Sequence, residues 1–313
     1  MAKKHVPIIA TSVVFLLLYT GASVSYESFF SWPVFLNLLN DNAFLGLAAL
    51  GMTFVILSGG IDLSVGSMIG FTSITIAVLV EQHGMSPVLA IPVVLFAGTV
   101  CGAGMGAIIA YFRIAPFLVT LAGMFLLRGL ALVISVESLP INHGIYSAIS
   151  NISMDYFPVT AVVFLAFTGV TLYIAHLTPF GRGTYAVGGG EDSAMLMGLP
   201  VNRIKVQIYA LSGLCSASAG VLYSMYTSSG NATAGTSLEL DAIAAVVIGG
   251  TLLSGGVGYV IGTFLGVLIL GTIQTILIFQ GTLSSWWAKF FIGGLLLLFI
   301  ILQRFIQKSI QKA

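Results

Sequence analysis

An eight-residue pattern, Gly-Gly-x-x-Leu-Ser-x-Gly, occurs twice in this sequence and interrupts apolar segments both times. It covers residues 59–66 and, 190 positions later, residues 249–256. Backbone N–H and C=O groups freed by such a break cannot face lipid, so the break must line a cavity or be buried in protein. Interrupted hydrophobic segments at corresponding places in two halves of a chain indicate the substrate path of a transporter. The pattern is short, so this prediction depends on the rest of the chain.

The composition places the chain in a membrane. Of 313 residues, 58% are hydrophobic and only 7% are charged, with a mean hydropathy of +1.08, whereas soluble domains carry about 25% charged residues. We therefore expect an all-α protein that crosses the lipid membrane several times. A net charge of +1 gives no indication of nucleic-acid binding. Both cysteines, Cys101 and Cys215, fall in apolar segments and are expected to be small buried hydrophobes, not a disulfide or a metal pair.

Ten apolar segments are candidate spans, and a spanning helix needs about 17–25 residues. They lie near residues 6–25, 41–58, 63–80, 88–111, 116–136, 158–176, 204–227, 240–254, 257–279 and 288–304. The segment 240–254 has only about 14 uninterrupted residues, roughly 21 Å of helix against a core of about 30 Å, so it is expected to be embedded in protein or re-entrant. Lys3 and Lys4 before the first span resemble a secretory signal. Because many spans follow, we favour an uncleaved first helix.

The basic residues predict the orientation. Ten spans put both termini on one side, and Lys and Arg are retained on the cytoplasmic side. With the termini inside, nine of the eleven basic residues are cytoplasmic: Lys3, Lys4, Arg113, Arg182, Arg203, Lys205, Arg304, Lys308 and Lys312. The other two are Arg128, inside a span, and Lys289, at the start of the last one. We therefore expect both termini in the cytoplasm.

Residues 177–203 form the longest hydrophilic stretch expected on that side. Within it, residues 191–199 are expected to form a short helix, with Gly188–Gly190 breaking the chain before it and Pro200 following its end. Glu191 and Asp192 would lie at the positive N-terminal end of this helix. Its small and apolar face consists of Ala194, Met195, Met197, Gly198 and Leu199. Such a face in water indicates a protein partner, although a loop folded back on its own membrane domain is an equal alternative.

Two blocks of sequence point to a known family. Glu-Asp-Ser-Ala-x-x-x-Gly-Leu-Pro, at 191–200, resembles the cytoplasmic coupling motif of ABC-importer permeases, which contacts the ATPase subunit. Ile-Leu-Ser-Gly-Gly-Ile-Asp-Leu-Ser-Val-Gly-Ser, at 56–67, resembles the signature of ribose-type sugar permeases. Further stretches are similar to one permease of the galactofuranose importer, and they lie at 41–46, 140–143, 240–258 and 281–287. The resemblance covers about residues 6 to 304. Related permeases often have Asn where this chain has Gly190.

The resemblance implies a single transmembrane permease domain over residues 1–313, with a cytoplasmic coupling loop at about 177–203. Such a permease belongs to a bacterial inner-membrane importer that carries a monosaccharide, galactofuranose or a related sugar such as ribose, inward. Its expected partners are a cytoplasmic ATP-binding cassette subunit, a periplasmic sugar-binding protein, and a second permease that is a paralogue or otherwise a second copy. The residues expected to couple to the ATPase are Glu191, Asp192, Ala194, Gly198 and Leu199.

The sequence carries no sign of bond-breaking chemistry. It contains no Gly-x-x-x-x-Gly-Lys-[Ser/Thr], so the chain has no phosphate-binding loop of its own. No His, Cys or carboxylate cluster has metal-ligand spacing, and the histidines are scattered. We therefore expect a transport subunit that is not an enzyme, with no cofactor on this chain and with ATP and magnesium on the partner. Two alternatives remain: a branched-chain amino-acid ABC permease, and an ion-coupled secondary transporter.

Asp62 and Arg128 are the charges expected within the membrane, where a charge costs about 2.5–3.5 kcal/mol on insertion scales. Arg128 either donates hydrogen bonds to sugar hydroxyls or pairs with Asp62, and we favour a structural role. Asp62 follows Gly59 and Gly60 and is expected to cap the next helix. A neutral sugar needs hydroxyls and amides along its path. The residues proposed for that path are Asp62, Ser64, Ser67, Arg128, Thr251 and Ser254, followed by Asn42, Thr53, Thr72, Thr272 and Gln274.

Two glycine stripes and one aromatic pair complete the sequence pattern. Glycines recur at every fourth position, first at 98, 102 and 106 and then at 258, 262 and 266. Each stripe permits close contact between helices, and we favour static packing within one subunit over a moving or dimer-forming seam. Trp286 and Trp287 beside Lys289 are expected to anchor the last span at the membrane interface.

Overall fold

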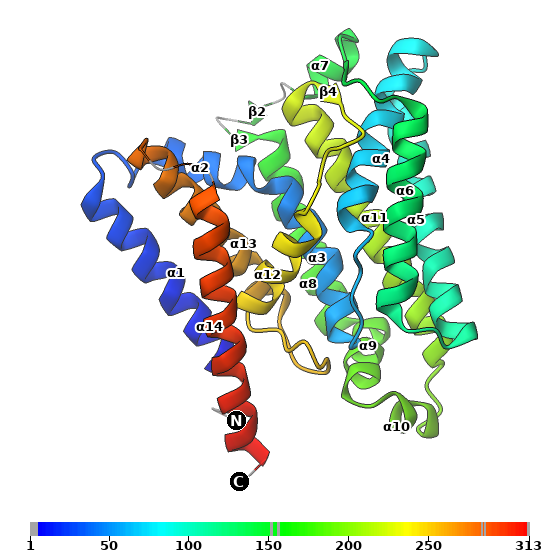
Figure 1. The fold of residues 1–313 in the computed structure, drawn as a ribbon, viewed down its shortest axis with the longest axis vertical. Helices are drawn as coiled ribbons and strands as arrows, with labels where there is room; N and C mark the ends of the chain where they lie inside the picture. Colours follow the sequence, from blue (N-terminus) through cyan, green and yellow to red (C-terminus); the bar gives the residue numbers. More distant parts are fainter. Residues whose placement is uncertain (1–5, 151–152, 155–156, 283, 285, 312–313) are drawn as a thin grey trace.

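The chain forms an elongated bundle of α-helices (Figure 1), seen in a computed structural model that describes residues 6–150, 153–154, 157–282, 284 and 286–311. Among these residues, seven helices are long and apolar enough to cross a membrane, or eight if the bent pair α2–α3 counts as one span. The helices are α1 Val6–Ser25, α2 Trp32–Asp41, α3 Ala43–Leu57, α4 Val65–Ala77 with the π-helical turn η2 Val78–Gln82, α5 Pro87–Phe112, α6 Pro116–Ile134, α7 Gly144–Ser150, α8 Val159–Leu177, α9 Pro179–Gly189, α10 Glu191–Leu196, α11 Val201–Thr227, α12 Leu238–Ile248, α13 Val260–Gln280 and α14 Trp286–Gln311.

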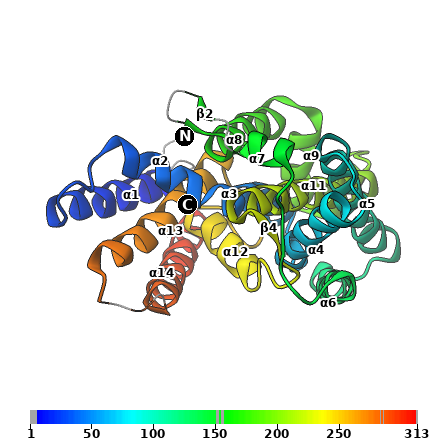
Figure 2. The ribbon, with the colours of Figure 1, turned by 90° about the horizontal axis from the view of Figure 1, so that it is seen from above.

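The two ends of the bundle differ. Helix α7 and the short strands lie at the upper end in Figure 1, whereas α9 and α10 lie at the lower end, where α1 begins and α14 ends. Strand β1 (Leu139–Pro140) pairs antiparallel with β4 (Ser229–Gly230), and β2 (Ser153–Met154) pairs antiparallel with β3 (Phe157–Pro158). Seen from above, α3 lies near the centre, with α5, α6, α9 and α11 at one side and α1 and α14 at the other (Figure 2).

Both glycine stripes pack against other helices or segments of the same subunit. On α5, a Cβ at Gly98 would lie 3.0 Å from the carbonyl oxygen of Gly213 on α11, and one at Gly106 would lie 3.0 Å from Cβ of Tyr209. On α13, a Cβ at Gly266 would overlap the backbone of α12 at Ala245, and one at Gly262 would overlap Gly249, directly after α12. Close backbone approach is the known use of small residues in membrane helices. The predicted packing within one subunit is confirmed for the residues on α5 and α13, whereas Gly258 lies before α13 and not on it.

Two of the expected spans are built differently from the prediction. The expected span 41–58 contains α3, but α2 precedes it and the two helices are bent by 55° at Asn42. The expected segment 240–254 is not one spanning helix, because α12 has 11 residues and a helix of that length is only about 16 Å long. Most of α12 is buried, in agreement with the expectation that this segment is embedded in protein. The Gly-Gly pair that follows ends α12, since Gly250 has φ +91°, a conformation that favours glycine.

The segment 177–203 also differs from the expected loop. It contains α9, which the sequence did not predict, and the short helix α10 ends at Leu196 rather than at residue 199. Gly188 and Gly189 lie inside α9, so the expected chain break across Gly188–Gly190 is wrong except at Gly190 itself. Cys215 is fully buried and Cys101 half-buried, and both are free thiols.

Candidate functional site

The two glycine-rich breaks meet at the lower end of the bundle. The backbone N–H of Gly256 donates to the carbonyl oxygen of Leu57, the last residue of α3, at 2.8 Å. A Cβ at Gly255 would lie only 2.8 Å from the backbone nitrogen of Gly59. Gly59, Gly255 and Gly256 all have positive φ, which explains why both breaks are glycine-rich. The repeated pattern therefore marks two segments that contact each other, although they are 190 positions apart.

Asp62 fixes the first break to neighbouring helices. Its carboxylate is buried and accepts hydrogen bonds from the Ser64 backbone N–H at 2.9 Å, from Ser64 Oγ at 2.6 Å and from Ser212 Oγ on α11 at 2.7 Å. Ser64, not Asp62, is the N-cap residue of α4, and no side chain caps that end, so the expected capping role of Asp62 is wrong; its bonds from Ser64 instead close the turn that precedes α4. One residue earlier, the carbonyl oxygen of Ile61 accepts from Thr120 on α6 at 3.1 Å. Asp62 therefore secures an extended backbone that carries no helical hydrogen bonds of its own.

Arg128 does not pair with Asp62, so that hypothesis is wrong. Its Nη1 donates to the carbonyl oxygens of Ala232 and Ala234, the latter at 2.9 Å. These carbonyls belong to the segment of turns between β4 and α12, which has no helical partners for them. The role of Arg128 in this conformation is therefore structural: it holds the segment 231–235 against α4 and α6.

The N-terminal ends of α4 and α12 lie side by side in the middle of the bundle, where α4 continues toward the upper end and α12 toward the lower end (Figure 1). A Cβ at Gly66, in the first turn of α4, would overlap Gly235 and the Glu239 side chain. Thr233, Thr236 and Ser237 are exposed beside this contact. Exposed hydroxyls midway between the two ends of a membrane bundle indicate a water-filled or protein-covered surface rather than lipid.

The other residues proposed for the substrate path divide into buried and exposed groups. Ser64, Ser67 and Thr251 are buried at 2% exposure or less, whereas Ser254 is exposed. Ser67 Oγ donates to the Ser64 carbonyl oxygen at 2.7 Å, as single hydroxyls in membrane helices commonly do. The same kind of backbone bond is made by Asn42, Thr53 and Thr272. Thr72 is buried, and Gln274 is exposed. Their role in a substrate path stays a prediction.

The residues expected to couple to the ATPase lie in α10 and directly after it, and they also divide into exposed and buried groups. Glu191 forms an ion pair with Lys205 at 2.6 Å, and Asp192 and Gly198 are exposed. Ala194 is fully buried against its own subunit and Leu199 is half-buried, so the expected apolar contact face does not include Ala194 in this conformation. The surface that projects into solvent consists of Met195, Leu196 and Met197, at 44%, 88% and 69% exposure.

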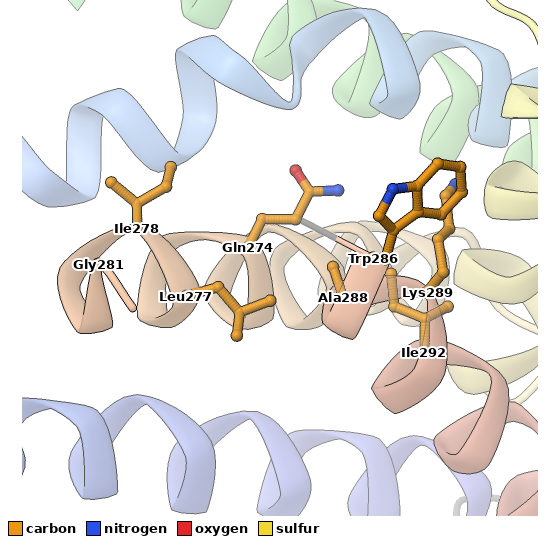
Figure 3. Close-up of a pocket in the computed structure, with 8 residues that line it drawn as sticks. All are labelled: Gln274, Leu277, Ile278, Gly281, Trp286, Ala288, Lys289 and Ile292. Atoms are coloured by element: carbon orange, nitrogen blue, oxygen red, sulfur yellow. The ribbon is translucent and has the colours of Figure 1, made fainter. Parts of the chain in front are cut away.

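A groove of about 630 Å³ lies between α13 and α14 (Figure 3). Trp286, Lys289 and Gln274 provide its polar atoms, and Leu277, Ile278 and Ile292 provide much of its apolar wall. Lys289 Nζ forms an ion pair with Asp241 of α12 at 2.5 Å, so its charge is already matched. Within the described residues, no group of three or more His, Cys, Asp or Glu side chains is arranged for a metal ion.

The sequence did not identify Tyr209, Ser212, Gly188 or Glu239 as parts of this arrangement. Ser212 and Tyr209 carried a local signal, since both are hydroxyls inside a long apolar helix. The contact of Ser212 with Asp62 joins residues 150 positions apart, and such a pairing follows only from the fold. The Tyr209 hydroxyl is buried near Gly60, with no hydrogen-bond partner in the part of the chain that the structure describes.

These features define a multi-pass α-helical membrane transporter with two broken segments. Residues 34–300 match the family described as branched-chain amino acid transport system / permease component, and the chain belongs to this family of ABC-transporter permeases. It is 49% identical over 309 residues to the inner membrane ABC transporter permease protein YjfF of Escherichia coli (strain K12), covering 97% of this chain and 93% of the relative.

Two further relatives carry names of sugar importers. The chain is 43% identical over 289 residues to the ribose import permease protein RbsC of Bacillus subtilis (strain 168), covering 90% of this chain and 88% of that relative. It is 36% identical over 313 residues to the fructose import permease protein FruG of Bifidobacterium longum (strain NCC 2705), covering 96% of this chain and 92% of that relative. No solved structure matches the chain. The family places the chain in the inner membrane as a transport subunit, not an enzyme, because ATP is hydrolysed by a separate subunit of such transporters.

Proposed function

We propose that the chain is the permease subunit of a bacterial ABC importer that moves a monosaccharide inward. Galactofuranose or a related sugar such as ribose is the expected substrate. The single observation that carries this proposal is the extensive similarity to relatives named as ribose and fructose import permeases. The exposed residues Thr233, Thr236 and Ser237 also support it, since hydroxyl groups match the hydrogen-bonding needs of a neutral sugar. The Thr233 and Thr236 hydroxyls donate to Asn231 and to the Thr233 carbonyl oxygen, and their oxygens can still accept from a sugar hydroxyl.

We propose that the chain is one transmembrane domain that crosses the membrane ten times, with both termini in the cytoplasm. Arg113, Arg182, Arg203 and Lys205 belong to elements at the lower end of Figure 1, which supports a cytoplasmic lower end. Lys3, Lys4 and Lys312 fall outside the described residues. The ten traversals would be α1, α3, residues 58–82, α5, α6, α8, α11, residues 229–248, α13 and α14.

A second permease, either a paralogue or another copy of this chain, would complete the path. Thr233, Thr236 and Ser237 would face lipid in an isolated subunit, which is unfavourable at this depth. In our proposal these residues face the partner permease across a path for the sugar. The cytoplasmic ATPase would bind the Met195–Met197 surface and carry the ATP and magnesium, and a periplasmic binding protein would deliver the sugar to the upper end.

Transport of a branched-chain amino acid is the second candidate, since the family description names that substrate class. An amino acid needs a cation for its carboxylate and an anion for its ammonium group. Arg128 and Asp62 are the charges that could serve this purpose, but Arg128 donates to backbone carbonyls and Asp62 accepts from serine hydroxyls. Both groups are therefore engaged within the protein, and the monosaccharide remains the better candidate.

Reconstitution tests the proposal directly. The permease, its partner permease and the ATPase are placed in proteoliposomes with the binding protein, and uptake of labelled galactofuranose, ribose and leucine is measured. We expect ATP-dependent uptake of one sugar and none of leucine. Leucine uptake without sugar uptake would favour the amino-acid permease, and uptake driven by an ion gradient without ATPase would contradict an ABC mechanism.

A further inference from the structure

Helix α9 contacts both glycine breaks at one point. Gly188 of α9 lies so close to the end of α3 that a Cβ there would overlap the carbonyl oxygen of Leu57, and it would lie 2.6 Å from the backbone nitrogen of Gly256. Leu57 and Gly256 are themselves joined by a backbone hydrogen bond of 2.8 Å. Three segments, α9, the end of α3 and the second break, therefore meet backbone to backbone, with no side chain between them.

A second contact lies one turn earlier on the same helix. The hydroxyl of Tyr185 donates to the carbonyl oxygen of Gly258, just before α13, at 2.8 Å. The ring of His176, near the end of α8, stacks on Tyr185 with ring centroids 6.3 Å apart. Burial, followed by the nearby Tyr259, raises the pKa of Tyr185 to about 12, so its hydroxyl keeps its proton and remains a donor. Residues 185 and 188 share one face of α9 because residues three apart are neighbours on a helix.

The other end of α9 leads directly to the solvent-exposed α10. Only Gly190 separates the two helices, and the Ala194 N–H donates back to its carbonyl oxygen at 2.9 Å. Met195, Leu196 and Met197 project from α10 into solvent. A force applied to these side chains therefore reaches α9 across Gly190, and it also reaches α11 through the ion pair between Glu191 and Lys205.

We propose that Gly188 and Tyr185 are positioning residues that carry a movement of α10 to the ends of α3 and α12. This inference rests on the proposed binding of the ATPase to α10. Gly188 contacts the junction of the two breaks directly through its backbone, so a displacement of α9 displaces the junction. Tyr185 links α9 by a hydrogen bond to the segment that leads into α13. Packed contacts of this kind move as units because tightly packed interfaces do not deform continuously.

Substitution of adjacent glycines gives a matched test in the reconstituted importer. Gly188→Ala inserts a methyl group into the junction, whereas Gly189→Ala places one where no atom lies within 4 Å. We expect Gly188→Ala to keep ATP hydrolysis but to lower sugar uptake per ATP roughly tenfold, within the range typical of coupling between sites. Gly189→Ala should retain both activities. Equal uptake per ATP in the two variants would overturn the proposal.

Tyr185 is tested by a conservative change. Tyr185→Phe keeps the ring but removes the donor to Gly258, and we expect uptake per ATP to fall severalfold while ATP hydrolysis persists. Tyr173→Phe serves as the control, since Tyr173 is exposed on α8. Normal uptake per ATP in Tyr185→Phe would remove Tyr185 from the proposal.

A distance measurement decides the matter if Gly188→Ala fails to assemble. Two spin-label pairs are made in a background with both natural cysteines replaced: Gly189→Cys with Val257→Cys, and Gly189→Cys with Val136→Cys. The distance within each pair is measured in the importer without nucleotide and with trapped ATP. We expect an unchanged distance from Gly189 to Val257, while the distance from Gly189 to Val136 at the opposite end changes. A change between Gly189 and Val257 as large as that to Val136 would overturn the proposal. Absence of sugar uptake by the unmodified importer would instead count against the proposed function.

Discussion

Ser212 Oγ donates a hydrogen bond of 2.7 Å to Oδ2 of Asp62, and this bond joins the middle of α11 to the first glycine break. The same carboxylate accepts from Ser64 through its other oxygen. Two parts of the chain that are far apart in sequence are thus held by one buried acid. An extended segment inside a membrane bundle needs such bonds because its backbone has no helical partners.

Removal of the Ser212 hydroxyl should therefore destabilise the protein. Ser212→Ala leaves one Asp62 oxygen without its donor, and hydrogen bonds to charged groups contribute about 1.5–3 kcal/mol. We expect a lower midpoint of thermal unfolding in detergent. Ser218→Ala is the control, because the Ser218 hydroxyl bonds only to its own helix at Leu214. Equal midpoints for the two variants would contradict the role of Asp62 given above.

Leu196 is expected to contact the ATPase directly. It is 88% exposed on α10, and central apolar residues of an interface commonly cost about 2 kcal/mol or more when removed. Leu196→Glu should therefore reduce copurification of the ATPase roughly thirtyfold. Val136→Glu is the control, since Val136 is 76% exposed after α6, away from α10. ATPase binding that tolerates Leu196→Glu as well as Val136→Glu would remove α10 from the interface.

Gly198 should act through its backbone. It has φ +80° and no atom lies within 4 Å of a Cβ built there, so conformational strain is the cost of any substitution. Gly198→Val should impair coupling, because β-branched residues rarely adopt positive φ, whereas Gly198→Asn should retain more activity, since Asn tolerates that region. Uptake per ATP in membranes with equal protein levels is the measurement. Equal uptake in the Val and Asn variants would show that the turn after α10 has no part in coupling.

The long helices follow directly from the sequence. The limits expected for one span, 88–111, differ by one residue at each end from α5, Pro87–Phe112, because a proline begins the helix and a continuous apolar run fills it. Hydropathy determines such segments, since every backbone group in a membrane must be bonded within its own helix. The two glycine breaks were predicted for the same reason.

The partners of the polar groups were not predictable in this way. Arg128 bonds to Ala232 and Ala234, which are 104 and 106 positions away, and neither alanine has a side chain that signals an acceptor. Gly188 was assigned to a chain break because three glycines in a row indicate a turn. A glycine is needed at position 188 because Leu57 and Gly256 lie too close for any side chain, and this proximity is determined by tertiary packing alone.

Replacement of Arg128 by methionine should loosen the segment 231–235. Methionine fills a similar volume but donates no hydrogen bonds, so the Ala232 and Ala234 carbonyls lose their donor, at a cost of about 1–3 kcal/mol for each unsatisfied group. We expect faster hydrogen–deuterium exchange in residues 231–241 and lower sugar uptake, with insertion into the membrane preserved. Leu130→Met is the control, since Leu130 is exposed on the same helix. If exchange in 231–241 is equal in the two variants, Arg128 does not hold this segment. Lost uptake with unchanged exchange would instead favour direct contact between Arg128 and the sugar.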